Sequence, residues 1–299
     1  MEIESKKHPY KFFLILILLN LFLISLSIFF FKSKEVNLNY FGLIFILLLI
    51  VFNYFFLKNS PKIIVDKYGI KFGKKKYLWE DSIEIKITGK GNGLIYSYYE
   101  STKISFKNQD VIYIYDEYYL NSSEIKSFIN QIVINKKKVF KKQQLNYTPK
   151  NLYLESFSDF KGHPILSFRG IMMWSVIIFF AFLPFYSSNK IQLIPLLIVY
   201  SFCLIWFLLS SWMMHYFRIS NKYFIVKNHY FFWTEKIYLL ENIEEIVYEQ
   251  QGKQSNALRI ITTDFKSTRF LAGSLSDKKW LKMKAIFEEK NIKVRNECI

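Results

Sequence analysis

The chain has 299 residues, of which 52% are hydrophobic and 19% aromatic, and its formal net charge is +17. A soluble domain rarely combines these values, so apolar and charged residues are expected to occupy separate segments. Of the two cysteines, Cys203 lies inside an apolar run and Cys298 at the end of the chain. This placement excludes a disulfide framework as the source of stability.

Four apolar runs carry no charged residue. They cover residues 12–31, 41–57, 170–186 and 193–214. Each is about as long as the ~20 residues that a helix needs to cross a bilayer core of ~30 Å. The first run is longer than a signal-peptide core and no small-residue cleavage site follows it. The sequence predicts two transmembrane hairpins, 12–57 and 170–214.

The loops within the hairpins are short, so the N-terminus and both polar segments are predicted to lie on one side of the membrane. Near the span ends that side holds twelve basic residues: Lys6, Lys7, Lys11, Lys58, Lys62, Lys67, Lys71, Lys161, Arg169, Arg218, Lys222 and Lys227. The short loops hold three: Lys32, Lys34 and Lys190. This bias favours a multi-pass protein of the inner (plasma) membrane with both termini and both polar domains in the cytoplasm.

The first polar segment, 58–145, reads as a small antiparallel sheet closed by one helix. Its β-branched and aromatic runs are 62–72, 75–79, 82–87, 94–99, 102–106 and 110–115. Asn121 and Glu124 then have the spacing of a capping box, and the apolar stripe that follows is Ile125, Phe128, Ile129, Ile132 and Val133.

The second polar segment, 215–295, repeats that order after a linker at 146–169. Its predicted strands are 216–227, 230–239, 243–250, 257–264 and 268–273, and Ser276 precedes a helix whose stripe holds Trp280, Met283 and Phe287. "LWEDSIEI" at 78–85 matches "LLENIEEI" at 239–246, and "VDKYGIKF" at 65–72 matches "SNKYFIVK" at 220–227. We interpret the chain as an internal duplication of a hairpin and a β-rich domain.

The stretches "ISNKYFIV", "YLLENIEEIVYEQ" and "LRIITTD" resemble bacterial PH-like domains that are attached to transmembrane hairpins. The resemblance covers roughly residues 216–290 and, more loosely, 62–135. It implies a fold class: an α+β membrane protein with two repeats, each a helical hairpin followed by a PH-like domain with a seven-stranded, bent antiparallel sheet and a C-terminal helix. It also implies a platform for lipids or proteins, and it assigns no active-site residues.

The repeated phrase has a structural and a functional interpretation. In the structural interpretation, the apolar residues of the phrase face the small core: Leu78, Ile83, Ile85, Leu239, Ile243 and Ile246. The acidic residues of the phrase then lie on the solvent-exposed face or at a turn: Glu80, Glu84, Glu241, Glu244 and Glu245. In the second, the glutamates form a binding edge or act as general bases, which would require a proton partner and a charge stabiliser nearby. No recognisable spacing supplies these, so the phrase is interpreted as a fold signature.

No motif indicates an enzyme, a metal site or a cofactor. The histidines His8, His163, His215 and His229 are scattered, and "GKGNG" at 89–93 lacks the Lys-Ser/Thr of a phosphate loop. The spans contain no ionisable residue, which disfavours an ion pathway, although Asn20 and Asn53 are placed to hydrogen-bond across the first hairpin. A membrane enzyme or transport accessory acting on lipids remains the alternative.

The remaining feature is charge. One lysine cluster, Lys74, Lys75 and Lys76, is predicted in the turn after the first strand. A second follows the first domain's helix and comprises Lys136, Lys137, Lys138, Lys141 and Lys142. Both are candidates for contact with anionic lipid, against the plainer interpretation that lysine is abundant throughout the chain. The expected partners are the membrane and either anionic lipid or a protein, with a homo-oligomer left open and nucleic acid disfavoured.

Overall fold

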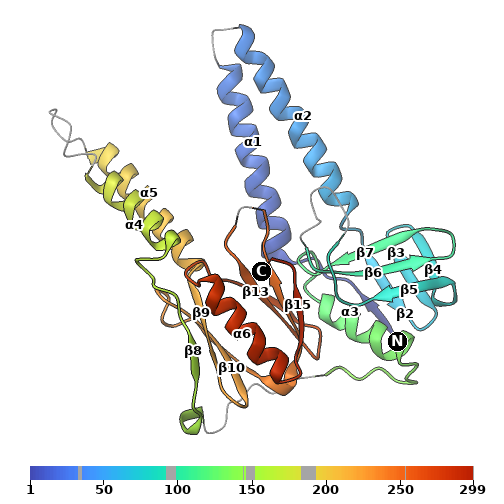
Figure 1. The fold of residues 1–299 in the computed structure, drawn as a ribbon. Helices are drawn as coiled ribbons and strands as arrows, with labels where there is room; N and C mark the ends of the chain where they lie inside the picture. Colours follow the sequence, from blue (N-terminus) through green and yellow to red (C-terminus); the bar gives the residue numbers. More distant parts are fainter. Residues whose placement is uncertain are drawn as a thin grey trace. The chain divides into compact units, whose positions relative to one another are not determined.

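A computed structural model describes residues 1–32, 36–91, 99–143, 145, 152–182, 193–252 and 254–298. The chain divides into two compact units, unit 1 (Met1–Gln143) and unit 2 (Gln144–Ile299). Each unit contains two apolar helices, β-sheets built mainly from antiparallel strands, and a helix after the sheets (Figure 1). The fold is therefore mixed α+β, as the sequence predicts.

Unit 1 contains seven strands among its described residues. In chain order its elements are β1 (Glu2–Glu4), a π-helical stretch (Pro9–Leu14), α1 (Ile15–Phe31), α2 (Val36–Lys58), β2 (Ile63–Asp66), β3 (Gly69–Phe72), β4 (Lys75–Leu78), a 3-10 turn (Trp79–Asp81), β5 (Ser82–Lys86), β6 (Ser101–Phe106), β7 (Val111–Tyr115) and α3 (Ser122–Phe128), which continues as a π-helical stretch (Ile129–Ile134). The sheets have the strand orders β1-β2-β3-β4 and β5-β6-β7.

The N-terminal residues form a strand of the first sheet, which the sequence analysis does not anticipate. β1 pairs antiparallel with β2, and Ile3 faces Val65. The Ser5 hydroxyl accepts from the Ile63 amide, and the Ser5 amide donates to the Ile63 carbonyl, both at 2.8 Å. The chain thus leaves this sheet, passes through α1 and α2, and returns to the same sheet.

Residues 62–72, predicted as one strand, form the β2–β3 hairpin. The Asp66 carboxylate accepts from the amides of Tyr68 (2.7 Å) and Gly69 (2.8 Å), which closes a tight turn. Residues 216–227 divide in the same way, because the Ser220 hydroxyl accepts from the amides of Lys222 and Tyr223. Local side-chain hydrogen bonds interrupt an otherwise continuous β pattern.

The repeated phrase packs differently from the prediction. In unit 1, Leu78 and Ile83 are exposed rather than buried, and Ile83 retains 69% of its accessible surface. The 3-10 turn rotates the chain so that Trp79 points into the core instead, and a bulge lies between Ser82 and Glu84. Alternation counted from Leu78 fails because the turn and the bulge each break the two-residue period.

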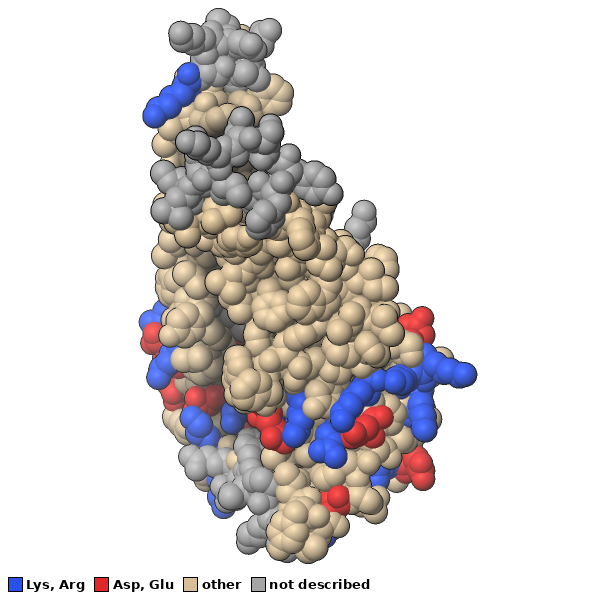
Figure 2. Space-filling view, turned by 90° about the vertical axis from the view of Figure 1, so that its left-hand side faces the viewer, with Lys and Arg blue, Asp and Glu red and all other residues tan. Residues whose placement is uncertain are grey.

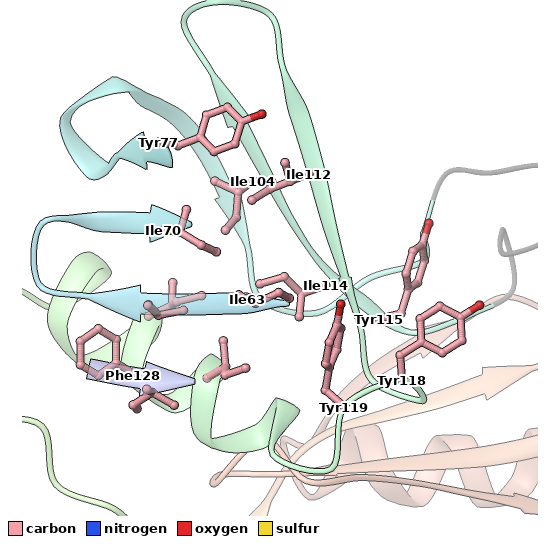
Figure 3. Packing of buried hydrophobic residues seen from close by; sticks show 14 of the residues in the cluster. Ile63, Ile70, Tyr77, Ile104, Ile112, Ile114, Tyr115, Tyr118, Tyr119 and Phe128 are labelled. Atoms are coloured by element: carbon pink, nitrogen blue, oxygen red, sulfur yellow. The ribbon is translucent and has the colours of Figure 1, made fainter. Parts of the chain in front are cut away.

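The core of unit 1 lies where side chains from both sheets and α3 meet. Figure 3 shows Ile63, Ile70, Ile104 and Ile114 converging from the strands, with Phe128 approaching from α3. Gly69 faces the Tyr77 carbonyl so closely that a Cβ atom would lie 2.2 Å from its oxygen. Glycine is therefore required at the start of β3, where it pairs with the end of β4.

Helix α3 does not begin with the predicted capping box. Asn121 occupies the N-cap position, but its side chain makes no capping hydrogen bond. Its Oδ1 instead accepts from the Lys6 amide and its Nδ2 donates to the Glu4 carbonyl, both at 2.8 Å. The side chain that was expected to cap the helix holds the N-terminal strand.

Helices α1 and α2 form an antiparallel hairpin with a polar contact inside it. Asn20 and Asn53 exchange reciprocal side-chain hydrogen bonds of 3.2 and 2.6 Å, as the sequence predicts. Nearer the tip, the Ser27 hydroxyl donates to the Gly42 carbonyl at 2.9 Å. These contacts fix the register of the two helices.

Unit 2 contains a closely similar order of elements. They are a 3-10 turn (Leu152–Leu154), β8 (Ser158–Phe160), α4 (Phe168–Phe182), α5 (Leu193–Trp212), β9 (His215–Ile219), β10 (Tyr223–Asn228), β11 (Glu235–Leu239), a 3-10 turn (Leu240–Asn242), β12 (Ile243–Glu249), β13 (Ala257–Thr262), β14 (Ser267–Leu271), α6 (Asp277–Glu289) and β15 (Lys293–Asn296). The sheet orders are β11-β10-β9-β8 and β14-β13-β12-β15.

β8 lies within residues 146–169, the predicted linker, and pairs antiparallel with β9. Both ends of the α4–α5 hairpin are also tied to the turn after β10. The Asn228 side chain donates to the Ser211 carbonyl at 2.8 Å, and the Tyr230 hydroxyl donates to the Pro164 carbonyl at 3.0 Å. Unit 2 therefore also holds the two ends of its hairpin at one sheet.

The C-terminal helix of unit 2 carries the predicted stripe. Trp280, Met283 and Phe287 of α6 are buried in a core with residues of both sheets. Ser276 occupies the N-cap position, but its side chain makes no capping hydrogen bond. After α6 the chain adds β15, which pairs parallel with β12.

By length and composition, two helices among the described residues could cross a membrane, Phe12–Phe31 and Asn39–Lys58. Phe168–Phe182 and Val199–Trp212 are shorter apolar helices. The predicted strand 94–99 and the two short hairpin loops fall wholly or partly outside the described residues, as does the end of the run 170–186.

Replacement of Asn121 by alanine tests the tie between α3 and the N-terminal strand. N121A removes two hydrogen bonds and should lower the stability of unit 1 by about 1 kcal/mol. Hydrogen exchange of residues 2–6 should accelerate, while exchange in β6 should change little. N135A removes a hydrogen bond to Asn130 at the far end of the helix and serves as the control. Unchanged protection of residues 2–6 in N121A would contradict this role.

Candidate binding surfaces

The first lysine cluster lies beside the exit of the α1–α2 hairpin. Lys74 lies in the turn between β3 and β4, and Lys75 and Lys76 begin β4. The Gly73 amide donates to the Lys62 carbonyl at 2.8 Å, four residues after α2 ends at Lys58. All three lysine side chains of the cluster are exposed.

One lysine of this turn is already paired. The Lys75 ammonium lies 3.1 Å from the Asp110 carboxylate, which also accepts from the Tyr77 hydroxyl at 2.9 Å. The hydrogen bond to Asp110 raises the pKa of Lys75. Lys74 and Lys76 are therefore the stronger candidates for binding an anion at this turn.

The second cluster divides into two parts. The Gln131 side chain accepts from the Lys141 amide (3.0 Å) and donates to its carbonyl (2.9 Å), and Phe140 packs on Phe128. Lys142 lies 3.3 Å from Glu124, near the start of α3. The exposed side chains of Lys136, Lys137 and Lys138 follow the other end of the helix, ~18 Å away at 1.5 Å per residue.

An open groove of about 560 Å³ lies between β5 and the end of the helix in unit 1. Its lining residues are Lys67, Trp79, Glu80, Ser82, Ile83, Glu84, Ile85, Ile132, Val133, Ile134 and Lys136. The first copy of the repeated phrase, which the sequence analysis interprets as a fold signature, therefore lines a surface groove. The sequence signal that could have indicated this groove is Ile134, an apolar residue outside the predicted helical stripe. The exposure of Ile83 was not predicted.

The glutamates of the repeated phrase have different environments in the two units. Glu84 is 41% exposed and contacts Lys86 (3.0 Å) and Lys103 (3.2 Å). Glu245, the matching residue, was expected on the wet face, but it is only 1% exposed. It lies 3.1 Å from the Lys293 ammonium and 3.4 Å from the Arg295 guanidinium. β15 supplies both basic residues, and this is the reason for the burial.

A second buried ion pair lies further along β12. Arg259 contacts the Glu249 carboxylate through Nε (3.2 Å) and Nη2 (3.0 Å), and Arg269 approaches it at 2.9 Å. Ser267 accepts from the other terminal nitrogen of Arg259 at 2.8 Å. This network holds β12, β13 and β14 together across one face and leaves no vacant basic group in its centre.

Three of the four histidines serve local structure. His163 Nδ1 accepts from the amides of Ile165 and Leu166, and His215 Nδ1 lies 2.9 Å from the Leu271 carbonyl. His229 packs against the Tyr216 ring. Within the described ranges, no three metal-ligating side chains gather at one point.

No protein-family model matches the chain, and no curated protein matches it.

The two matching glutamates give an asymmetric prediction. E245A leaves Lys293 and Arg295 without their shared carboxylate and should destabilise unit 2 by about 1–3 kcal/mol. E84A, its matched control in unit 1, should cause no measurable change because Glu84 is solvated. Thermal unfolding of the purified chain measures both. Equal losses of stability would contradict the difference in burial.

His229 gives a prediction about pH. Burial lowers the pKa of His229 to about 4, and Lys161, His163, His215 and Lys279 add to that effect. Between about pH 4 and the ordinary histidine value near 6.5, the unfolded chain binds the proton that the folded chain rejects, so stability should rise with pH. H229Q should flatten this rise, as measured by unfolding midpoints across the range. An unchanged slope would show that other groups cause it.

Proposed function

We propose that the protein is a multi-pass membrane protein whose two β-rich domains form a non-enzymatic binding platform at the leaflet. The surface of the helical hairpins carries the proposal. Large apolar side chains stand exposed all along α1 and α2: among them are Ile17, Leu21, Phe22, Ile28, Leu43, Leu47, Ile50 and Tyr54. A surface of this kind is stable when a membrane or partner covers it.

The distribution of charge supports the same assignment. On the face drawn in Figure 2, lysine, arginine and acidic side chains gather over the β-rich part, and the helices carry almost none. Tyr40 and Tyr54 are exposed towards the two ends of α2, at positions suited to headgroup level. Lys58 lies 5.5 Å from the Tyr54 ring at the end nearer the sheets.

Strand pairing supports the topology. Because β1 and β2 flank the first hairpin and belong to one sheet, both ends of that hairpin meet the same domain. β8 and β9 flank the second hairpin in the same way. We propose that both domains and both termini lie on the cytoplasmic side of the inner membrane, in agreement with the lysine bias. The similar order of elements in the two units supports an origin by duplication and the PH-like assignment of each domain.

The ligand that we propose is the anionic headgroup layer, with the turn at Lys74–Lys76 as its main contact. The hydrogen bond between Gly73 and Lys62 places this turn beside the end of α2. A lysine near an anionic leaflet gains attraction that falls off within a Debye length. Lys142, beside the start of α3, is a second contact, whereas Lys136, Lys137 and Lys138 lie at the distant end of that helix.

This difference between the clusters is testable. In mixed micelles of phosphatidylglycerol and phosphatidylethanolamine, the purified protein should retain the anionic lipid preferentially, more strongly at 50 mM than at 500 mM salt. K74Q/K75Q/K76Q should reduce that preference on the order of tenfold, as measured by mass spectrometry of the retained lipid. K136Q/K137Q/K138Q is the matched control and should change it little. Equal effects would contradict the assignment of the headgroup site.

A further inference from the structure

The two units differ most at one sheet edge. In unit 2, β12 pairs with β13 on one side and with β15 on the other. In unit 1, β5 corresponds to β12 through the repeated phrase and pairs with β6 alone among the described residues. The other edge of β5 faces the groove that Ile132, Val133 and Ile134 border. An unpaired edge presents backbone donors and acceptors to any extended chain.

The two C-terminal helices end alike, but the chain then diverges. Lys136 and Asn291 each follow the helix with a positive φ, 50° and 58°, the usual left-handed conformation at a helix end. In unit 2, Ile292 and Val294 then pack on the core while Lys293 and Arg295 face Glu245. The sequence after Asn291 therefore alternates apolar and basic residues, as a half-buried strand requires.

Unit 1 diverts its own chain from this position. Lys137 and Lys138 replace the alternating pattern, and Phe140 packs back on Phe128. The Gln131 side chain donates one hydrogen bond to the Lys141 backbone and accepts another from it, and these two bonds hold Lys141 beside the helix. The segment that would close the groove is thus fixed elsewhere. Ile83 is exposed, and no strand in the described part of the chain covers this edge.

We propose that this groove binds an extended segment of a partner protein, which adds to β5 as a parallel strand in the way that β15 adds to β12. Unit 2 sets the expected register, in which Glu245 faces Lys293, Ile246 faces Val294 and Val247 faces Arg295. Main-chain hydrogen bonds supply affinity in this mode of recognition, and alternate side chains supply specificity.

The residues of β5 define the sequence that fits. Glu84 occupies the position of Glu245 and favours a basic residue opposite it. Lys86 occupies the position of Val247, so it favours an acidic residue where β15 has Arg295. Ile85 and the helix residues favour apolar side chains between them. The partner segment therefore has the order apolar, basic, apolar, acidic. Residues 292–295 of unit 2 have the order apolar, basic, apolar, basic, so the difference lies at the position of Arg295.

Peptide binding to the full-length protein in detergent tests this proposal without reference to lipid. The first probe is a fluorescent peptide with the sequence of residues 289–297, and the second is the same peptide with R295E. Fluorescence anisotropy should show tighter binding of the R295E peptide by about two- to fivefold, the effect of one solvent-exposed ion pair. K86E in the protein should reverse this preference. K71E, on an exposed lysine of β3, is the matched control and should leave it unchanged.

Backbone pairing has its own readout. Two further R295E peptides carry N-methyl groups on alternate residues, and because the amides of a strand point alternately to its two sides, one set should abolish binding and the other should not. Failure of both unmethylated peptides to bind, or equal effects of the two methylated sets, would overturn the proposal. Tighter binding of the unaltered β15 sequence would overturn it in favour of a second copy's C-terminal strand.

Discussion

The architecture depends on antiparallel pairing between the strand before each apolar hairpin and the strand after it. β1 pairs with β2 across the first hairpin, and β8 pairs with β9 across the second. In each unit this closes a loop whose two ends are fixed at one sheet, so the helices leave and return at the same place. This constraint makes a hairpin the simplest arrangement for the apolar runs. It also holds the polar residues before and after each hairpin beside the same sheet.

Within this shared framework, the two units are completed differently. Unit 2 fills the edge of β12 with its own C-terminal strand and buries Glu245 beneath two basic side chains. Unit 1 turns the corresponding segment back along its helix, and among the described residues β5 pairs with β6 alone. One domain is therefore closed, and the other retains a groove of about 560 Å³. We propose that the two units in this way separate a structural task from a binding task.

Much of the fold could be predicted from the sequence, because most strands, the closing helices and the Asn20–Asn53 contact follow from composition and period. The errors have local causes. Because of the 3-10 turn before β5, Trp79 rather than Leu78 lies in the core, and a two-residue period does not predict that rotation of the chain. Glu245 looked solvent-facing because its partner strand, β15, lies about fifty residues later. The groove was missed for the same reason: in unit 2 a strand lies at this edge, and the described residues of unit 1 supply none there.

The most direct test of the account is the sidedness of the first hairpin loop relative to the C-terminus. Two variants each contain a single cysteine. C203S retains only Cys298, and K32C/C203S/C298S has only an introduced cysteine at residue 32, at the start of the loop. In intact cells, a membrane-impermeant maleimide should label the residue-32 cysteine and should label Cys298 only after permeabilisation. Labelling of both cysteines from the same side would contradict a membrane-spanning hairpin and with it the proposed platform.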